Sequence, residues 1–291
     1  MRDLTIIGER INPGFKSSKA LFDHLDIEGI QALAIKQADA GAHYINVNIG
    51  MLALENPEFM KEVIVKLQDV VDIPLSIDFP NLEVQEMCLK IYDPAKANGA
   101  KPIINSLAEP RWDMAEALKI QPSRIVVMAS ERLEDGRGKP NKTPQEIYST
   151  AKRLAARLVK EYGITMNDII VDVSILTLAA DREGLVRAAL DAVKLIGEDP
   201  ELQGIHMMGG ISNIGMMLPP KAADGGVLKR RVERAFVTMA QPHGFDTVLA
   251  TPWDTYEHLP EDDFVLTTFK ELLERSGIDA VTHMRKLYLP A

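Results

Sequence analysis

Short polar side chains recur where apolar runs of this sequence end. Residues 74–78 end in the carboxylate of Asp78, residues 102–105 in the amide of Asn105, and residues 169–172 in the carboxylate of Asp172. The whole set of such residues is Glu9, Asn12, Asn46, Asn48, Asp78, Asn81, Asn105, Asp172, Ser212 and Asn213. Asn and Asp are common after strands as turn formers and helix caps, so the argument rests on their recurrence and on no single one of them.

These residue types indicate what kind of ligand they could bind. Asp78 and Asp172 would accept hydrogen bonds from ring or exocyclic N–H groups, whereas the Asn105 amide can donate and accept at once. Few Lys or Arg residues stand beside them in the sequence. A site of this composition suits a neutral ligand rich in N–H donors and carbonyls, such as a fused nitrogen heterocycle.

Alternating strand and helix patterns supply the elements that would position these side chains. We expect strands at 4–7, 44–48, 74–78, 102–105, 124–128, 169–172, 204–208 and 247–250. We expect helices at 26–40, 57–70, 82–97, 112–118, 144–162, 182–196, 228–239, 262–275 and 279–286. Eight strand and helix pairs predict an α/β protein of the (β/α)8 TIM barrel type, in which the carboxyl ends of the strands share one mouth. We find no domain boundary and expect a single domain over residues 1–291.

Two segments near the predicted mouth are open to more than one interpretation. Residues 131–142 are polar and follow the fifth strand, so they form either a mobile lid or, as the simpler interpretation, a solvated loop. Gly209 and Gly210 follow the seventh strand, where barrels often bind phosphate. Against phosphate, Pro252 after the eighth strand offers no backbone N–H, and we expect no Lys or Arg near the ends of these two strands.

Composition excludes several classes of function. The net charge of −9 argues against a nucleic-acid partner, because phosphate binding needs a concentrated positive surface. No apolar run approaches the ~20 residues of a membrane span, and a predicted strand begins almost at the first residue, so we expect a cytoplasmic protein. The single cysteine, Cys88, and six histidines without metal-ligand spacing predict no bound metal.

The order of these motifs resembles a known family. The motifs are Ile7-Gly8-Glu9-Arg10-Ile11-Asn12, Asn46-Val47-Asn48-Ile49-Gly50, Asp78 with Asn81, Ile104-Asn105-Ser106, Asp172 and Ile211-Ser212-Asn213. From Ile6 to about Asp254 the chain is similar to the methyltetrahydrofolate:corrinoid protein methyltransferases, which include the tetrahydrofolate methyltransferase components of corrinoid-dependent demethylase systems. The resemblance rests on the ordered set of motifs.

The resemblance implies roles for the polar set. Asp78, Asn105 and Asp172 would hold a pterin ring by hydrogen bonds, and Asn213 would lie beside N5 of the ring as the catalytic residue. The supporting residues would be Glu9, Asn12, Asn48, Asn81 and Ser212. The implied reaction is an SN2 methyl transfer between the cobalt of a corrinoid and N5 of tetrahydrofolate, so that tetrahydrofolate or 5-methyltetrahydrofolate is a substrate.

The resemblance also implies partners and leaves alternatives open. No corrinoid-binding motif is present, so a separate corrinoid protein would supply the cobalt, and family members usually form homodimers. Asn46 stands where an Asp is expected, and residues 214–221 are more apolar than expected. The alternatives are an enzyme like dihydropteroate synthase, a folate-binding subunit without catalysis, or a phosphate-binding barrel enzyme of another class.

Overall fold

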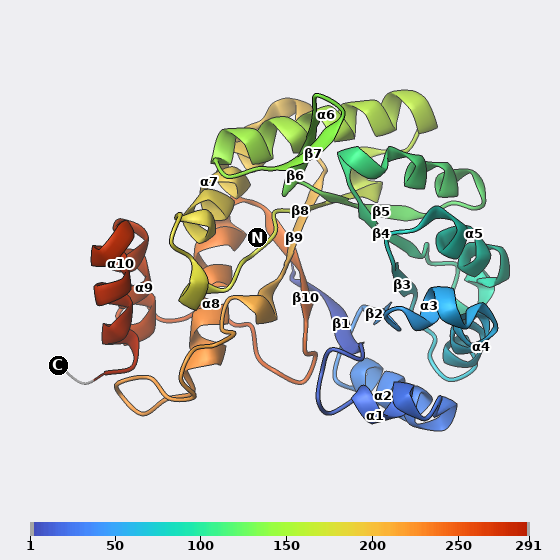
Figure 1. The fold of residues 1–291 in the computed structure, drawn as a ribbon, viewed down its shortest axis with the longest axis horizontal. Helices are drawn as coiled ribbons and strands as arrows, with labels where there is room; N and C mark the ends of the chain where they lie inside the picture. Colours follow the sequence, from blue (N-terminus) through green and yellow to red (C-terminus); the bar gives the residue numbers. More distant parts are fainter. Residues whose placement is uncertain (1–2, 290–291) are drawn as a thin grey trace.

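Eight parallel strands close into a barrel in the computed structural model, which describes residues 3–289 (Figure 1). The barrel strands are β1 (Thr5–Ile11), β2 (Tyr44–Val47), β3 (Leu75–Asp78), β4 (Ile103–Leu107), β5 (Arg124–Met128), β8 (Ile169–Asp172), β9 (His206–Gly210) and β10 (Phe245–Ala250). Around the barrel they follow chain order, and β10 pairs with β1 to close it. The (β/α)8 barrel predicted from the sequence is confirmed.

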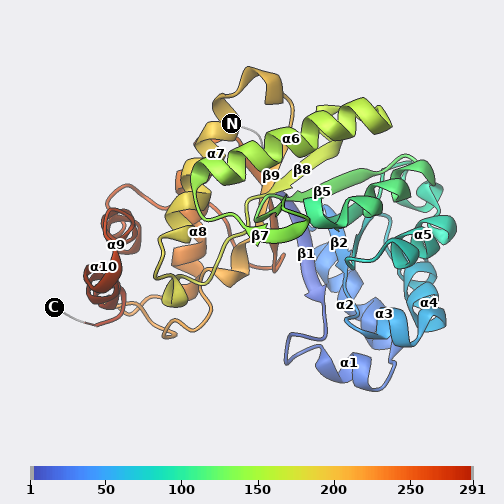
Figure 2. The ribbon, with the colours of Figure 1, turned by 45° about the horizontal axis from the view of Figure 1, so that its top comes forward.

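Helices surround the barrel. The α-helices are α1 (Lys19–Asp23), α2 (Ile27–Asp39), α3 (Leu52–Glu55), α4 (Pro57–Gln68), α5 (Leu82–Ile91), α6 (Pro144–Tyr162), α7 (Leu185–Glu198), α8 (Leu228–Ala240), α9 (Phe264–Leu273) and α10 (Gly277–Met284). The 3-10 helices are η1 (Pro94–Ala97), η2 (Glu109–Lys119), η3 (Met166–Asp168), η4 (Leu178–Ala180), η5 (Pro200–Leu202), η6 (Ile211–Asn213), η7 (Gln241–His243) and η8 (Arg285–Leu287). Helices α9 and α10 lie side by side on the outer side of α8 (Figure 2).

Local sequence explains the best predicted helix, α6. Thr143 and Glu146 form a reciprocal capping box at its start, where Pro144 fits because the first helical residue needs no N–H partner. Gly163 ends the helix in the left-handed conformation, at φ 66°. None of the helices in residues 3–289 is long and apolar enough to cross a membrane.

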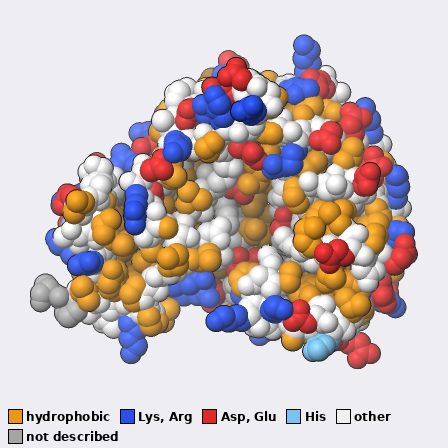
Figure 3. All heavy atoms as spheres, in the orientation of Figure 1, with side chains coloured by type: hydrophobic (Ala, Val, Ile, Leu, Met, Phe, Trp, Pro, Cys, Tyr) orange, Lys and Arg blue, Asp and Glu red, His pale blue; other side chains and the backbone are white. Residues whose placement is uncertain are grey.

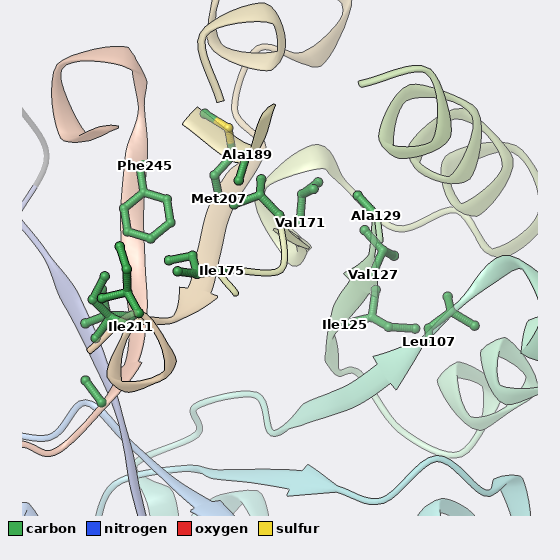
Figure 4. Close-up of a cluster of buried hydrophobic side chains, with 14 of the residues drawn as sticks. Leu107, Ile125, Val127, Ala129, Val171, Ile175, Ala189, Met207, Ile211 and Phe245 are labelled. Carbon is green, nitrogen blue, oxygen red and sulfur yellow. The ribbon is translucent and has the colours of Figure 1, made fainter. Parts of the chain in front are cut away.

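The strands bury a different set of side chains on each face, as expected for a period of two residues. Outward-facing side chains pack against the helices, and Figure 4 shows Val171 and Met207 of neighbouring strands pointing toward Ala189 of α7. A separate cluster fills the barrel interior, formed by Ile7, Ile103, Val126, Ile170 and Met208. This apolar layer closes the barrel beneath its mouth.

The structure adds secondary structure to residues 131–142, which the sequence left open as a mobile lid or a solvated loop. They contain an antiparallel hairpin of β6 (Glu131–Glu134) and β7 (Arg137–Pro140). Its turn residues Asp135 and Gly136 both have positive φ, at 53° and 74°. An Asp-Gly turn of this kind matches the twist of a hairpin, so the signal was present in the sequence.

Candidate active site

Several polar side chains of the set lie one layer above the apolar interior of the barrel. Glu9, Asn105 and Asp172 each follow a residue of the interior cluster by two positions, so the strand period places them on the same inner face. The view of Figure 1 looks onto the carboxyl ends of the strands, and the same view in Figure 3 shows a hollow near the centre. The predicted mouth is therefore a hollow lined by polar side chains from several strands.

Asp78, at the end of β3, is held by three uncharged donors. Its Oδ2 accepts from Asn46 Nδ2 at 2.9 Å and from Asn48 Nδ2 at 3.1 Å. Its Oδ1 accepts from Ser106 Oγ at 3.1 Å. These donors orient the carboxylate without a cation, and a carboxylate with about four acceptor sites keeps one for a ligand. Asn46 therefore serves as a donor where a second Asp would repel Asp78.

Asp172, at the end of β8, has more capacity left to accept hydrogen bonds. The backbone N–H of Ser174 donates to Oδ1 at 2.6 Å, and no residue within 3–289 donates to Oδ2. Burial raises the pKa of this carboxyl from 3.8 to about 6, the Ser174 N–H opposes the rise, and the nearby Asp78 charge adds to it. A ligand with two N–H donors would relieve this poorly solvated charge.

Two serines beside these carboxylates have unusual backbone conformations. Ser106 has φ 79° and Ser174 has φ 57°, in the left-handed region that residues other than Gly rarely occupy. Ser106 donates its hydroxyl to Asp78, and Ser174 donates its N–H to Asp172. Such strain concentrates at binding sites, where the surrounding structure maintains it. The sequence analysis gave no role to either serine, although each stands within two residues of a predicted site residue.

Asn105 is less exposed than the two carboxylates. It is buried, and its Nδ2 makes only long contacts, to Asn46 Oδ1 at 3.4 Å and to Ser76 Oγ at 3.5 Å. Its backbone carbonyl lies 3.4 Å from Nε2 of the fully buried Gln85. The Asn105 amide is thus placed by its neighbours without strong side-chain bonds and can rearrange to meet a ring.

Glu9 joins three adjacent strand ends. The carboxylate is 5% exposed, and it accepts from Ser212 Oγ at 2.7 Å and from Thr251 Oγ1 at 2.8 Å. Burial raises its pKa, while the two hydroxyls and the charges of Lys229 and Arg10 oppose that rise. The sequence analysis missed Thr251, which directly follows β10.

Asn213 lies on an exposed part of the rim, in the η6 turn after β9. A Cβ on Gly210 would come within 2.9 Å of Asn213 Nδ2, and a Cβ on Gly209 would come within 2.5 Å of Ile175. Close packing against the buried Ile175 thus explains Gly209 without a phosphate, whereas the flexible end of the Asn213 side chain could move away from a Cβ at Gly210.

Asn12 and Asn81 lie outside this network. Asn12 Oδ1 accepts from the Gly14 N–H in the loop after β1. Asn81 Oδ1 accepts from the Val84 N–H and caps α5. Asn48 belongs to the network and also holds a loop, since its Nδ2 donates to Asp78 and its Oδ1 accepts from the Gly50 N–H. Asn12 and Asn81 therefore shape the loops at the mouth.

The prediction that Lys and Arg are absent near the ends of the seventh and eighth strands is wrong. Arg230, in the first turn of α8, lies 2.6 Å from Asp254 in the loop after β10 and 2.9 Å from the buried Glu233. Lys229 lies 3.9 Å from Glu233. The sequence could not show this, because more than twenty residues separate Arg230 from Asp254. Carboxylates match these cations, so they leave little positive charge for a phosphate.

Large apolar side chains are exposed around the mouth. They come from the loops after β2, β5, β8, β9 and β10, and they are Met51, Leu133, Leu176, Met216, Met217 and Trp253. Met217 is 79% exposed and has φ 64°, which presents its side chain outward at some cost in backbone strain. We call these residues the apolar rim.

Comparisons with known proteins agree with this site. The sequence pattern of the family described as "Pterin binding enzyme" matches residues 9–250. A methylcorrinoid:tetrahydrofolate methyltransferase of Eubacterium limosum is 25% identical over 265 residues, which cover 86% of this chain and 85% of that protein.

Solved structures of dihydropteroate synthases share the fold. The enzyme from Clostridium difficile aligns with a TM-score of 0.58 at 22% identity, covering 88% of this chain and 92% of that one. The enzyme from Thermus thermophilus aligns with a TM-score of 0.57 at 14% identity, covering 86% and 90%. Identities this low show the fold alone. The family match spans nearly the whole barrel and includes the polar residues described at the mouth except Thr251 and Asp254, so this chain belongs to the family of pterin-binding enzymes.

Proposed function

We propose that this protein transfers a methyl group between the cobalt of a corrinoid protein and N5 of tetrahydrofolate. The observation that carries the proposal is the pair of carboxylates, Asp78 and Asp172, held at one mouth by uncharged donors. The similarity to a methylcorrinoid:tetrahydrofolate methyltransferase along most of the chain supports it. Together they favour a neutral ring with N–H donors over an anionic ligand.

The methyl transfer needs neither an oxidant nor a reductant. Toward folate, the N5 lone pair forms the new N–C bond, the electron pair of the Co–C bond stays on the corrinoid, and N5 then releases its proton. In reverse, N5 must be protonated before it can leave. The residues of this chain would mainly hold the two substrates in line, and positioning of this kind lowers a barrier substantially.

Each part of the mouth has a task in this proposal. Asp172, with one oxygen open, would accept two N–H groups of the pyrimidine ring, and Asp78 and Asn105 would bind the remaining polar edge. Asn213 would face N5, where its amide can accept from a protonated nitrogen or donate to a lone pair. The apolar rim would receive the partner that carries the corrinoid.

A dihydropteroate synthase activity requires a diphosphate leaving group. Arg230, the cation beside the loop after β10, is matched by the carboxylates of Asp254 and Glu233. This arrangement favours methyl transfer over a reaction with a diphosphate leaving group. We also propose a single domain, a cytoplasmic location and a homodimer.

Calorimetry with tetrahydrofolate and spectroscopic assays with free methylcobalamin or cob(I)alamin test the proposal. We expect micromolar binding, about −8 kcal/mol, and methyl transfer in at least one direction. Asn213→Ala should slow transfer more than it weakens binding, whereas Asp172→Ala should weaken binding by about 1–3 kcal/mol. Absence of binding to any reduced folate would reject the proposal. Turnover of a pterin diphosphate with 4-aminobenzoate would instead establish the alternative, and binding without turnover would indicate a folate-binding subunit.

A further inference from the structure

Glu9 and Ser212 connect the barrel wall to the turn that carries Asn213. Ser212 is 8% exposed, and its Oγ lies 2.7 Å from Glu9 Oε2, although the two residues are 203 positions apart in the sequence. Thr251 holds the other oxygen of the same carboxylate from the neighbouring strand. The carboxylate therefore has a fixed position, and Ser212 is bound to it.

The same turn is also packed against α8. A Cβ on Gly215 would come within 3.1 Å of the Lys229 Cα in the first turn of α8. The Ser212–Glu9 bond on the barrel side and this close approach on the α8 side thus confine the backbone on which Asn213 stands.

We propose that Glu9 and Ser212 are positioning residues that hold the Asn213 amide at the reacting nitrogen. This inference rests on the proposed function. Neither residue needs to touch the substrate, because Ser212 is bonded to Glu9 and its backbone continues directly into Asn213. A displacement of about 1 Å at a reacting centre can cost up to about a hundredfold in rate, so a tether beside Asn213 affects the rate of transfer.

A purely structural role predicts a different pattern of effects. Loss of the Glu9–Ser212 bond would then lower stability and weaken every function of the mouth to a similar degree. A positioning role predicts a lower kcat with unchanged folate affinity, and it predicts that the loss disappears once Asn213 is gone. A double-mutant cycle separates the two cases, because independent sites add in free energy and coupled sites do not.

The experiment compares three single variants, Ser212→Ala, Glu9→Gln and Asn213→Ala. It also tests the two double variants that combine Ser212→Ala or Glu9→Gln with Asn213→Ala. Each is assayed in single-turnover methyl transfer with free methylcobalamin and tetrahydrofolate. We expect Ser212→Ala and Glu9→Gln each to slow transfer about tenfold or more. The dissociation constant of tetrahydrofolate should stay within about twofold. In the Asn213→Ala background neither substitution should slow transfer further.

Ser123→Ala is the matched control. Ser123 is also buried, at 3% exposure, and donates to the Gln121 carbonyl before β5, at the opposite end of the barrel. It should leave the transfer rate unchanged in both backgrounds. Three results would overturn the inference and leave the proposed function intact. The first is an unchanged transfer rate in Ser212→Ala and Glu9→Gln, the second is rate losses that multiply with that of Asn213→Ala, and the third is rate losses that equal the losses of folate affinity. A wild-type protein without turnover refutes the proposed function and the inference with it.

Discussion

Substitution of Asp172 by Asn removes a charge that the folded protein solvates poorly. The carboxyl has a pKa of about 6 in place of 3.8, because burial and the nearby Asp78 disfavour its ionised form. A raised pKa means that the folded state binds the proton more tightly than the unfolded chain does. Ionisation of Asp172 therefore lowers stability as the pH rises from about 3.8 to about 6, and the full loss persists above that range.

The size of this effect follows from the shift. About two pKa units at 1.36 kcal/mol each correspond to roughly 3 kcal/mol. This value is an upper limit, since the side chain is partly exposed at the mouth and water screens its charge. The Asn variant keeps an acceptor for the Ser174 N–H but carries no charge. We expect it to stabilise the ligand-free protein at about pH 8 by up to ~3 kcal/mol, or roughly 4–6 °C in Tm.

Thermal and urea unfolding of the ligand-free protein at several pH values measures the effect. The stability gain of Asp172→Asn should shrink as the pH falls from about 8 to about 5, because the wild-type carboxyl becomes protonated. Folate affinity should fall by about 1–3 kcal/mol in the same variant. In the wild type it should rise with pH until about 6 and then level off, because the ionised carboxylate accepts both N–H groups.

Asp168→Asn is a control that should change stability in the opposite direction. Asp168 lies at the other end of β8, where burial is outweighed by hydrogen bonds from Lys101 and Thr165 that lower its pKa. Its ionised form stabilises the fold, and this stabilisation is lost as the pH falls through the lowered pKa, so the Asn variant should be less stable at about pH 8. If Asp172→Asn destabilises the protein as Asp168→Asn does, or if its gain is independent of pH, our account of Asp172 is incorrect.

Three further outcomes are expected. Asn46→Asp replaces a donor 2.9 Å from Asp78 with a second carboxylate, so the free energy of unfolding should fall by about 1–3 kcal/mol. High salt should reduce this loss, because it screens the repulsion between the two carboxylates. Equal losses for Asn46→Asp and Asn46→Leu would exclude charge repulsion as the cause. Met217→Asp should slow transfer with a corrinoid protein and leave transfer with free methylcobalamin unchanged, and equal rates with both donors would remove the apolar rim from the docking surface. Burial raises the pKa of Cys88 to about 12, so an aromatic disulfide should label it only after unfolding, and rapid labelling of the native protein at about pH 8 would contradict that burial.

The sequence by itself determined the barrel and most of the carboxylates and amides at its mouth. Strand and helix periods are local properties, so eight pairs could be counted from residue types alone. Asp78, Asn105 and Asp172 could be identified because each lies at or near the carboxyl end of its strand, and parallel strands of a barrel share one carboxyl end. The Asp-Gly turn of the hairpin was equally local, and we overlooked it.

Only the tertiary structure decided how these groups are connected. The bond between Glu9 and Ser212 spans 203 residues, and the approach of Arg230 to Asp254 depends on how α8 packs beside β10. The pKa of Asp172 likewise follows from burial and from a charge on another strand. Contacts between distant segments and the solvation of a charge depend on the three-dimensional arrangement of the whole barrel, and no local pattern in the sequence records them.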